Sequence, residues 1–148
     1  MGKIYRNKPL AFDEYLGHVS PDDGKVYETR FGPDRYVGRV ELNTGKVYHT
    51  RFGPDEYLGR IDLTTGKTHH TKFGPDEYIG RVTSDGKLYR HVPLGFDKYV
   101  GKVTEMHSLA EGGAAFLLFF YEGRTEEEKV EDETATEETE GNEGSKGN

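Results

Sequence analysis

The sequence contains no cysteine and no tryptophan, and it has only two methionines among 148 residues. Without cysteine, the chain has no disulfide, no thiolate metal ligand and no cysteine nucleophile. Long apolar runs are also missing. The longest, residues 114 to 121, has eight residues, whereas a helix needs about 20 to cross a bilayer. The first six residues lack the apolar core of a secretory signal, so we expect a soluble, cytoplasmic protein without a transmembrane segment.

An excess of charge of one sign is confined to the C-terminal end. Residues 124 to 148 contain ten acidic and three basic side chains, 3 − 10 = −7, which equals the formal net charge of the whole chain. Residues 1 to 123 therefore balance, and strong nucleic-acid binding is not expected. Because residues 124 to 148 contain very few apolar side chains, we predict that they form a disordered acidic tail.

A repeat of 21 residues runs from residue 2 to about residue 105. An aspartate, a tyrosine and a glycine each recur five times at this spacing, and a Gly-Lys pair opens every unit. Turn-forming residues separate two apolar segments within each unit, which is typical of β-hairpins. The sequence therefore predicts an all-β fold, a five-hairpin antiparallel meander of about ten strands.

Loop length gives an expected register for the hairpins. A three-residue Asn43-Thr44-Gly45 loop places Val40 opposite Tyr48, and the preceding hairpin places Tyr27 opposite Val40. At the fourth connection, Asp85-Gly86 predicts a two-residue turn that keeps the same faces in phase. One face then carries rings and branched side chains on either side of a trough of glycine and threonine, and we expect it to be buried. Its outer row consists of Tyr15, Phe31, Tyr36, Phe52, Tyr57, Phe73, Tyr78 and Tyr99.

Residues 109 to 121 are the only apolar segment outside the repeat, and they are apolar on all sides. Such a segment is usually buried. We expect a curled sheet, or one closed into a barrel, with this segment packed on the aromatic face as a short helix or an added strand. A second copy packed face to face, or insertion of the segment into a partner or a membrane surface, are the alternatives. The chain thus divides into repeats (2–105), a docking segment (106–123) and a tail (124–148).

The opposite face of the predicted sheet alternates charged with aliphatic side chains. Arginine suits phosphate and carboxylate ligands, so a basic band on this face is a candidate site for an anionic ligand. A solvated face with weak cross-strand ion pairs is the simpler reading. A small apolar molecule in the Gly/Thr trough is a further ligand hypothesis. The basic band consists of Arg30, Arg39, Arg51, Arg60, Lys72 and Arg81.

No pattern in the sequence indicates catalysis. No nucleophile lies beside a matching base, and no phosphate loop, dinucleotide fingerprint or calcium loop occurs. His69 and His70 are adjacent, so on a regular strand they point to opposite faces and cannot share a metal ion. We therefore expect no enzyme, no cofactor and no metal, and favour a structural or protein-interaction module whose partner is another protein or a second copy.

The pattern Tyr-x-Gly-x-Val/Ile, followed after a turn by Gly-Lys, resembles MORN-type β-hairpin repeats. One instance is residues 36 to 40 with Gly45-Lys46, and the resemblance extends over residues 2 to about 105. It implies elongated single-layer sheets that serve in scaffolding, self-association, and lipid or protein binding.

Overall fold

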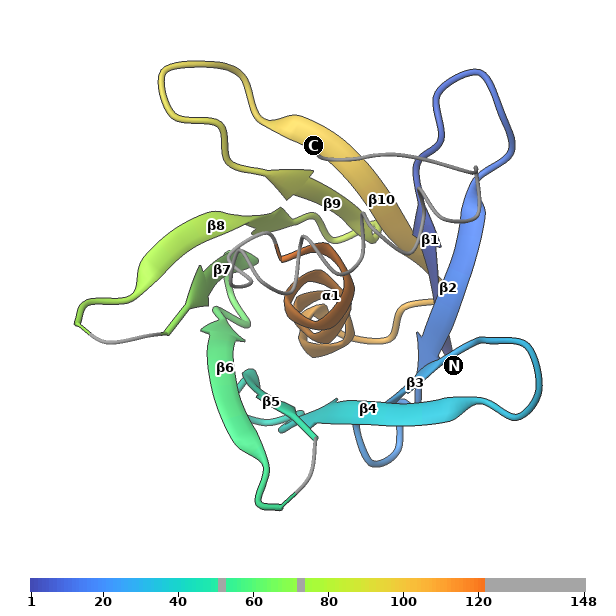
Figure 1. Cartoon of the computed structure of the whole chain (residues 1–148). Helices are drawn as coiled ribbons and strands as arrows, with labels where there is room; N and C mark the ends of the chain where they lie inside the picture. Colours follow the sequence, from blue (N-terminus) through green and yellow to red (C-terminus); the bar gives the residue numbers. More distant parts are fainter. Residues whose placement is uncertain (51–52, 72–73, 122–148) are drawn as a thin grey trace, which may run out of the picture.

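The structure, a computed structural model, describes residues 1–50, 53–71 and 74–121. Ten strands form a closed antiparallel barrel in which each strand pairs with its neighbours in sequence and β1 pairs with β10 (Figure 1). The predicted all-β meander of ten strands is confirmed, and the barrel is closed. The strands are β1 (Gly2–Arg6), β2 (Glu14–Val19), β3 (Lys25–Glu28), β4 (Arg35–Val40), β5 (Lys46–His49), β6 (Glu56–Ile61), β7 (Lys67–His70), β8 (Glu77–Val82), β9 (Lys87–Arg90) and β10 (Lys98–Thr104).

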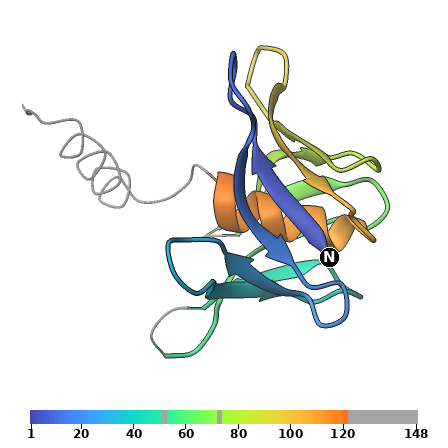
Figure 2. The same cartoon turned by 90° about the vertical axis from the view of Figure 1, so that its right-hand side faces the viewer.

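The apolar C-terminal segment lies inside the barrel as a helix. It consists of an α-helical part, α1 (Leu109–Ala115), and a π-helical part, η1 (Phe116–Phe120). Figures 1 and 2 show this helix along the barrel axis, surrounded by strands. Closure of the sheet and the chain's own helix therefore cover the inner face, and the segment is not an added strand.

The lumen is narrow, and small helix residues make the fit possible. Ala110, Ala114 and Ala115 are fully buried. A Cβ atom built on Gly113 would lie 2.4 Å from Cγ2 of Ile61, and one on Gly112 would lie 2.4 Å from a methyl group of Val82. Because these contacts are too short for a methyl group, the glycines are required by the close approach of helix and strands.

The inner face is aliphatic, which corrects the sequence-based prediction of a buried aromatic face. Each strand contributes one side chain to a buried ring around the helix, and none of these side chains is aromatic. The tyrosines of the repeat are half-buried on the outside or exposed. The ring consists of Ile4, Val19, Val26, Val40, Val47, Ile61, Thr68, Val82, Leu88 and Val103.

A difference of one residue in the turns explains this error. Val40 pairs with Val47, and the N–H of Glu41 donates to the carbonyl of Lys46 at 2.8 Å, so four residues lie in the turn instead of three. The turn that contains Asp85 and Gly86 is likewise one residue longer than predicted. Since side chains alternate along a strand, each shift of one residue moves Tyr48 and its equivalents to the outer face.

Each long hairpin contains a β-bulge, which shifts the alternation of side chains along one strand by one residue. Tyr27 pairs with Tyr36, but Val26 pairs with Gly38, so Val37 is the extra residue of the bulge and packs into the core. A Cβ atom on Gly38 would lie 2.3 Å from the carbonyl oxygen of Tyr48. The glycine that recurs every 21 residues is therefore required by close backbone contact next to a bulge.

The turns and loops segregate to opposite ends of the barrel. Short turns join even-numbered to odd-numbered strands at one end, and long loops join odd-numbered to even-numbered strands at the other. The helix enters at the short-turn end and ends at the long-loop end (Figure 2). We call this second region the long-loop end.

Candidate functional site

Three of the predicted anion-binding residues form ion pairs on the outside of the barrel. Arg39, Arg60 and Arg81 each contact an aspartate that lies 16 residues further along the chain. The distances from Nε to the carboxylate oxygen are 2.9 Å to Asp55, 3.2 Å to Asp76 and 3.1 Å to Asp97, respectively. The ion pair of Lys102 with Asp13, across the junction of β1 and β10, continues this outer girdle around the barrel, and a carboxylate oxygen of Asp34 lies 3.7 Å from Nδ1 of His18.

The outer girdle also contains the aromatic rings that were expected inside. The guanidinium carbon of Arg39 lies 4.1 Å from the centre of the Tyr48 ring, and that of Arg81 lies 4.2 Å from the ring of Tyr89. The rings of Tyr48 and Tyr57 lie beside each other with centres 5.5 Å apart. Half-buried tyrosines thus support the arginines through cation–π contacts.

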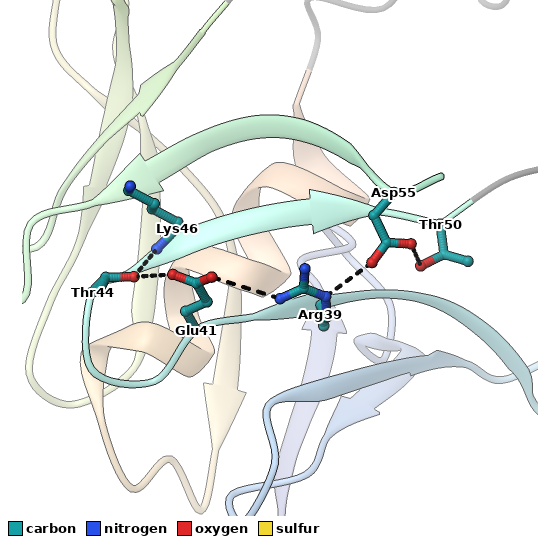
Figure 3. Close-up of polar contacts among 6 residues, drawn as sticks. All are labelled: Arg39, Glu41, Thr44, Lys46, Thr50 and Asp55. Atoms are coloured by element: carbon teal, nitrogen blue, oxygen red, sulfur yellow. Dashed lines mark hydrogen bonds and ion pairs between the residues drawn. The ribbon is translucent and has the colours of Figure 1, made fainter. Parts of the chain in front are cut away.

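Figure 3 shows one unit of the girdle in detail. Arg39 lies between the carboxylates of Asp55 and Glu41, and Thr50 donates to the second oxygen of Asp55 at 2.9 Å. Thr44 in turn donates to Glu41 at 2.7 Å. The hydrogen bonds from Arg39 and Thr50 lower the pKa of Asp55 below its ordinary value. Each arginine therefore already has an anionic partner, and an external anion would have to displace it.

The predicted basic band is not brought together as one site. Arg39, Arg60 and Arg81 lie on β4, β6 and β8, with their side chains on the outside of the barrel. Arg30 lies in the long loop between β3 and β4 and is exposed. Among the described residues, Arg30 forms no ion pair. The other two predicted residues, Arg51 and Lys72, lie outside the described residues.

The long-loop end exposes large apolar side chains. Phe31 and Leu10 both reach 107% relative exposure, and Phe12, Leu94 and Phe96 are exposed to between 96% and 108%. They come from the three long loops whose residues are all described, which join β1 to β2, β3 to β4 and β9 to β10. Figure 1 shows these loops projecting outward from the barrel in separate directions. We call these five side chains the apolar loop tips.

Two of the apolar loop tips lie in an unfavourable backbone conformation. Leu10 has φ of 64° and Leu94 has φ of 61°. A side chain with Cβ costs about 1 kcal/mol or more in the left-handed region, and neither leucine recovers this cost by burial. Strained, exposed positions of this kind concentrate at functional sites.

The centre of the long-loop end is closed by the end of the helical segment. Tyr121 stacks on His70, with ring centres 3.9 Å apart, and its hydroxyl oxygen lies 2.7 Å from Nδ1 of His70. Burial, together with the charge of Glu77, raises the pKa of Tyr121 to about 12. The half-buried Leu118 and Phe119 pack against the core beside it. The lumen is therefore occupied by the protein's own side chains, where the trough hypothesis placed a small apolar ligand.

A carboxyl group is buried at the opposite end of the lumen. Glu111 is 1% exposed, its Oε2 accepts the backbone N–H of His107 at 3.0 Å, and its Oε1 has no hydrogen-bond partner within the described structure. Burial raises the pKa of this carboxyl above its ordinary value of 4.5. The start of the helix and β1 cover this end, so the Glu111 carboxyl is out of contact with solvent. Its burial therefore influences the free energy of unfolding.

Two searches of the described residues bear on other kinds of site. In residues 1–50, 53–71 and 74–121, no three His, Asp or Glu side chains cluster as metal ligands would. In the same part of the chain, no helix has the length and apolar character needed to cross a membrane.

The sequence-based reasoning missed the apolar loop tips. It assigned Phe31 to the buried row and left Leu10, Phe12, Leu94 and Phe96 without a role. One signal was available: the phenylalanine is followed by Gly-Pro-Asp in the inner units, and it lies in Pro-Leu-x-Phe-Asp in the outer units. Residues that flank such turn formers belong to loops, where alternation no longer indicates a face.

No family model, no curated protein and no solved structure matches this chain. The MORN-type resemblance stays a prediction, and the sheet itself is a closed barrel.

Proposed function

We propose that the protein is a non-enzymatic interaction module. The barrel is the rigid support, and the long-loop end is the surface that contacts the partner. The observation that carries this proposal is the nearly complete exposure of five large apolar side chains on three loops of the same end. Exposed apolar residues that are scattered singly are ordinary, whereas here large apolar side chains recur on every fully described long loop at one end of the barrel.

Two features favour binding over catalysis. The lumen, where a β-barrel commonly holds a ligand, is filled by α1 and η1, including the buried Phe116 and Phe120. Arg39, Arg60 and Arg81 are paired with aspartates, so an anionic substrate would have to displace these partners. The loop tips, by contrast, make no contribution to the core that would explain their apolar character.

Photo-crosslinking tests this proposal. A photoreactive phenylalanine analogue is placed at Phe31, and a matched control carries it at Leu63, which lies in the turn between β6 and β7 and is 37% exposed. After irradiation in the cells from which the gene comes, we expect adducts from position 31 only. These adducts should disappear when Leu10, Phe12, Leu94 and Phe96 are changed to serine. Equal labelling from both positions, or none from either, would contradict an interaction surface at the loops.

A further inference from the structure

We propose that the long-loop end docks on the surface of an anionic lipid bilayer, with the apolar loop tips inserted at the boundary between headgroups and acyl chains. This inference rests on the proposed function and names its partner. The evidence lies in loop residues that are not part of the Tyr-x-Gly motif of the repeat.

The separation of the apolar loop tips favours a bilayer over a protein partner. The apolar loop tips lie on three loops that project outward in different directions from the barrel (Figure 1). A protein interface has a packed, contiguous apolar centre with matching shape. A bilayer is fluid, accepts separate side chains to a depth of roughly 5 to 10 Å, and requires no matching shape.

The strained leucines support the same reading. Leu10 and Leu94 occupy equivalent positions of the first and last long loops, with φ of 64° and 61°, and both are fully exposed. In water, glycine or asparagine would fit these positions better. The energetic disadvantage of leucine is offset only where its side chain leaves water, which insertion into the bilayer boundary achieves.

The charges around the loops indicate that the lipid is anionic. Two of the aspartates at the ends of the fully described long loops pair with a cation on a neighbouring strand, Asp13 with Lys102 and Asp97 with Arg81. The third, Asp34, lies 3.7 Å from Nδ1 of His18. The two ion pairs neutralise the acidic groups of the first and last long loops. The exposed Arg30, directly next to Phe31, forms no ion pair within the described part of the chain, so its charge is available to a lipid phosphate.

Vesicle flotation tests the proposal with the full chain. Two kinds of vesicle are compared, one of phosphatidylcholine alone and one in which about a third of the lipid is phosphatidylserine. We expect the protein to float with the phosphatidylserine vesicles and much less with phosphatidylcholine, and added salt should reduce binding because it screens the charges. Binding that is equally strong to both vesicles would contradict the anionic assignment.

Matched variants separate the two kinds of contact. Changing Leu10, Phe12, Leu94 and Phe96 to serine should lower binding to both vesicles at least about tenfold. Arg30→Gln should lower binding to phosphatidylserine vesicles about fivefold, the effect of roughly 1 kcal/mol for one cation near such a surface. The controls at the short-turn end, Leu63→Ser and Lys46→Gln, should bind as the unchanged chain does.

The outcomes also distinguish this inference from the proposed function. If the unchanged chain does not float, and position 31 still crosslinks to a protein or to a second copy, the lipid assignment is wrong and the interaction module stands. If neither flotation nor crosslinking occurs, both are wrong. Should the fourfold variant fail to fold by circular dichroism, Phe31→Ser alone supplies the same comparison on another loop, and unchanged flotation of that variant would overturn insertion of Phe31.

Discussion

Replacing Gly113 with alanine should destabilise this barrel, although the same substitution stabilises an ordinary helix by about 0.5 to 1 kcal/mol. The new Cβ would lie 2.4 Å from Cγ2 and 2.6 Å from Cβ of Ile61. The Cβ atom of Ile61 cannot move without its strand, so the overlap has to be relieved by a shift of helix or barrel. Such overpacking costs about 1 to 3 kcal/mol. The net expectation is a loss of up to roughly 2.5 kcal/mol in the free energy of unfolding.

Urea unfolding followed by circular dichroism measures this loss, and Gly95→Ala is the control. Gly95 lies in an exposed loop, where the nearest atom to a new Cβ is 3.2 Å away on the Val92 side chain. This control should change stability by no more than about 0.5 kcal/mol. A higher stability of Gly113→Ala would show that the helix does not pack against β6 in the lumen.

A double-mutant cycle with Ile61→Ala sharpens the test. Alone, Ile61→Ala should cost about 2 to 5 kcal/mol because it leaves a cavity in the core. In the double variant the alanine methyl group at position 113 occupies part of that cavity, so the combined loss should be smaller than the sum by about 0.5 to 3 kcal/mol. Additive losses would mean that Gly113 and Ile61 are not in contact, and the packing described above would be wrong.

Four further predictions follow from the structure. Glu111→Gln should remove a pH dependence of the free energy of unfolding. Burial raises the pKa of Glu111, so the folded state holds the proton more tightly than the unfolded state does. The unchanged chain should therefore lose stability relative to the variant as pH rises through the folded-state pKa, and urea unfolding curves between about pH 4 and pH 8 measure this loss. Gly59→Ala should lower the free energy of unfolding by more than about 2 kcal/mol, since the new Cβ would lie 2.1 Å from the carbonyl oxygen of His69. A normal melting temperature would exclude the bulge geometry. Leu94→Asn should raise the melting temperature, because asparagine tolerates positive φ better than leucine; an unchanged or lower value would argue against strain. Removing residues 124 to 148, which carry a net charge of −7, should strengthen binding to phosphatidylserine vesicles at low salt by reducing repulsion, and equal flotation of both chains would contradict this.

The repeat made the strands predictable, but it left their faces undetermined. Each strand carries apolar side chains on both sides, valine at position 40 and tyrosine at position 48, for example, and the choice between them depended on the length of a turn. One additional residue in each short turn and one bulge in each long hairpin were enough to reverse the faces. Successive side chains of a strand point to opposite faces, so a shift of one residue moves every side chain of that strand to the other face.

The candidate site was predicted only in part. Basic residues on the outside of the sheet were expected from the sequence, and Arg39, Arg60 and Arg81 lie there. Their aspartate partners could not be identified, because each pair joins residues 16 positions apart, from one strand to the loop of the next unit. The exposure of Phe31 could not be predicted from the sequence either, since a phenylalanine is ordinarily assigned to a core.

The sequence by itself determined the elements: the period of 21 sets ten strands and their turns, the uniformly apolar segment must be buried, and the charge is concentrated in the last 25 residues. These properties are local, because they depend on neighbouring residues and on composition. Only the tertiary structure decided that the sheet closes, that valine and isoleucine face the helix, and that the tyrosines remain outside with the arginines. Those outcomes depend on volume: a lumen that already holds a helix leaves room for aliphatic side chains and glycine, but not for a ring of tyrosines with polar hydroxyl groups.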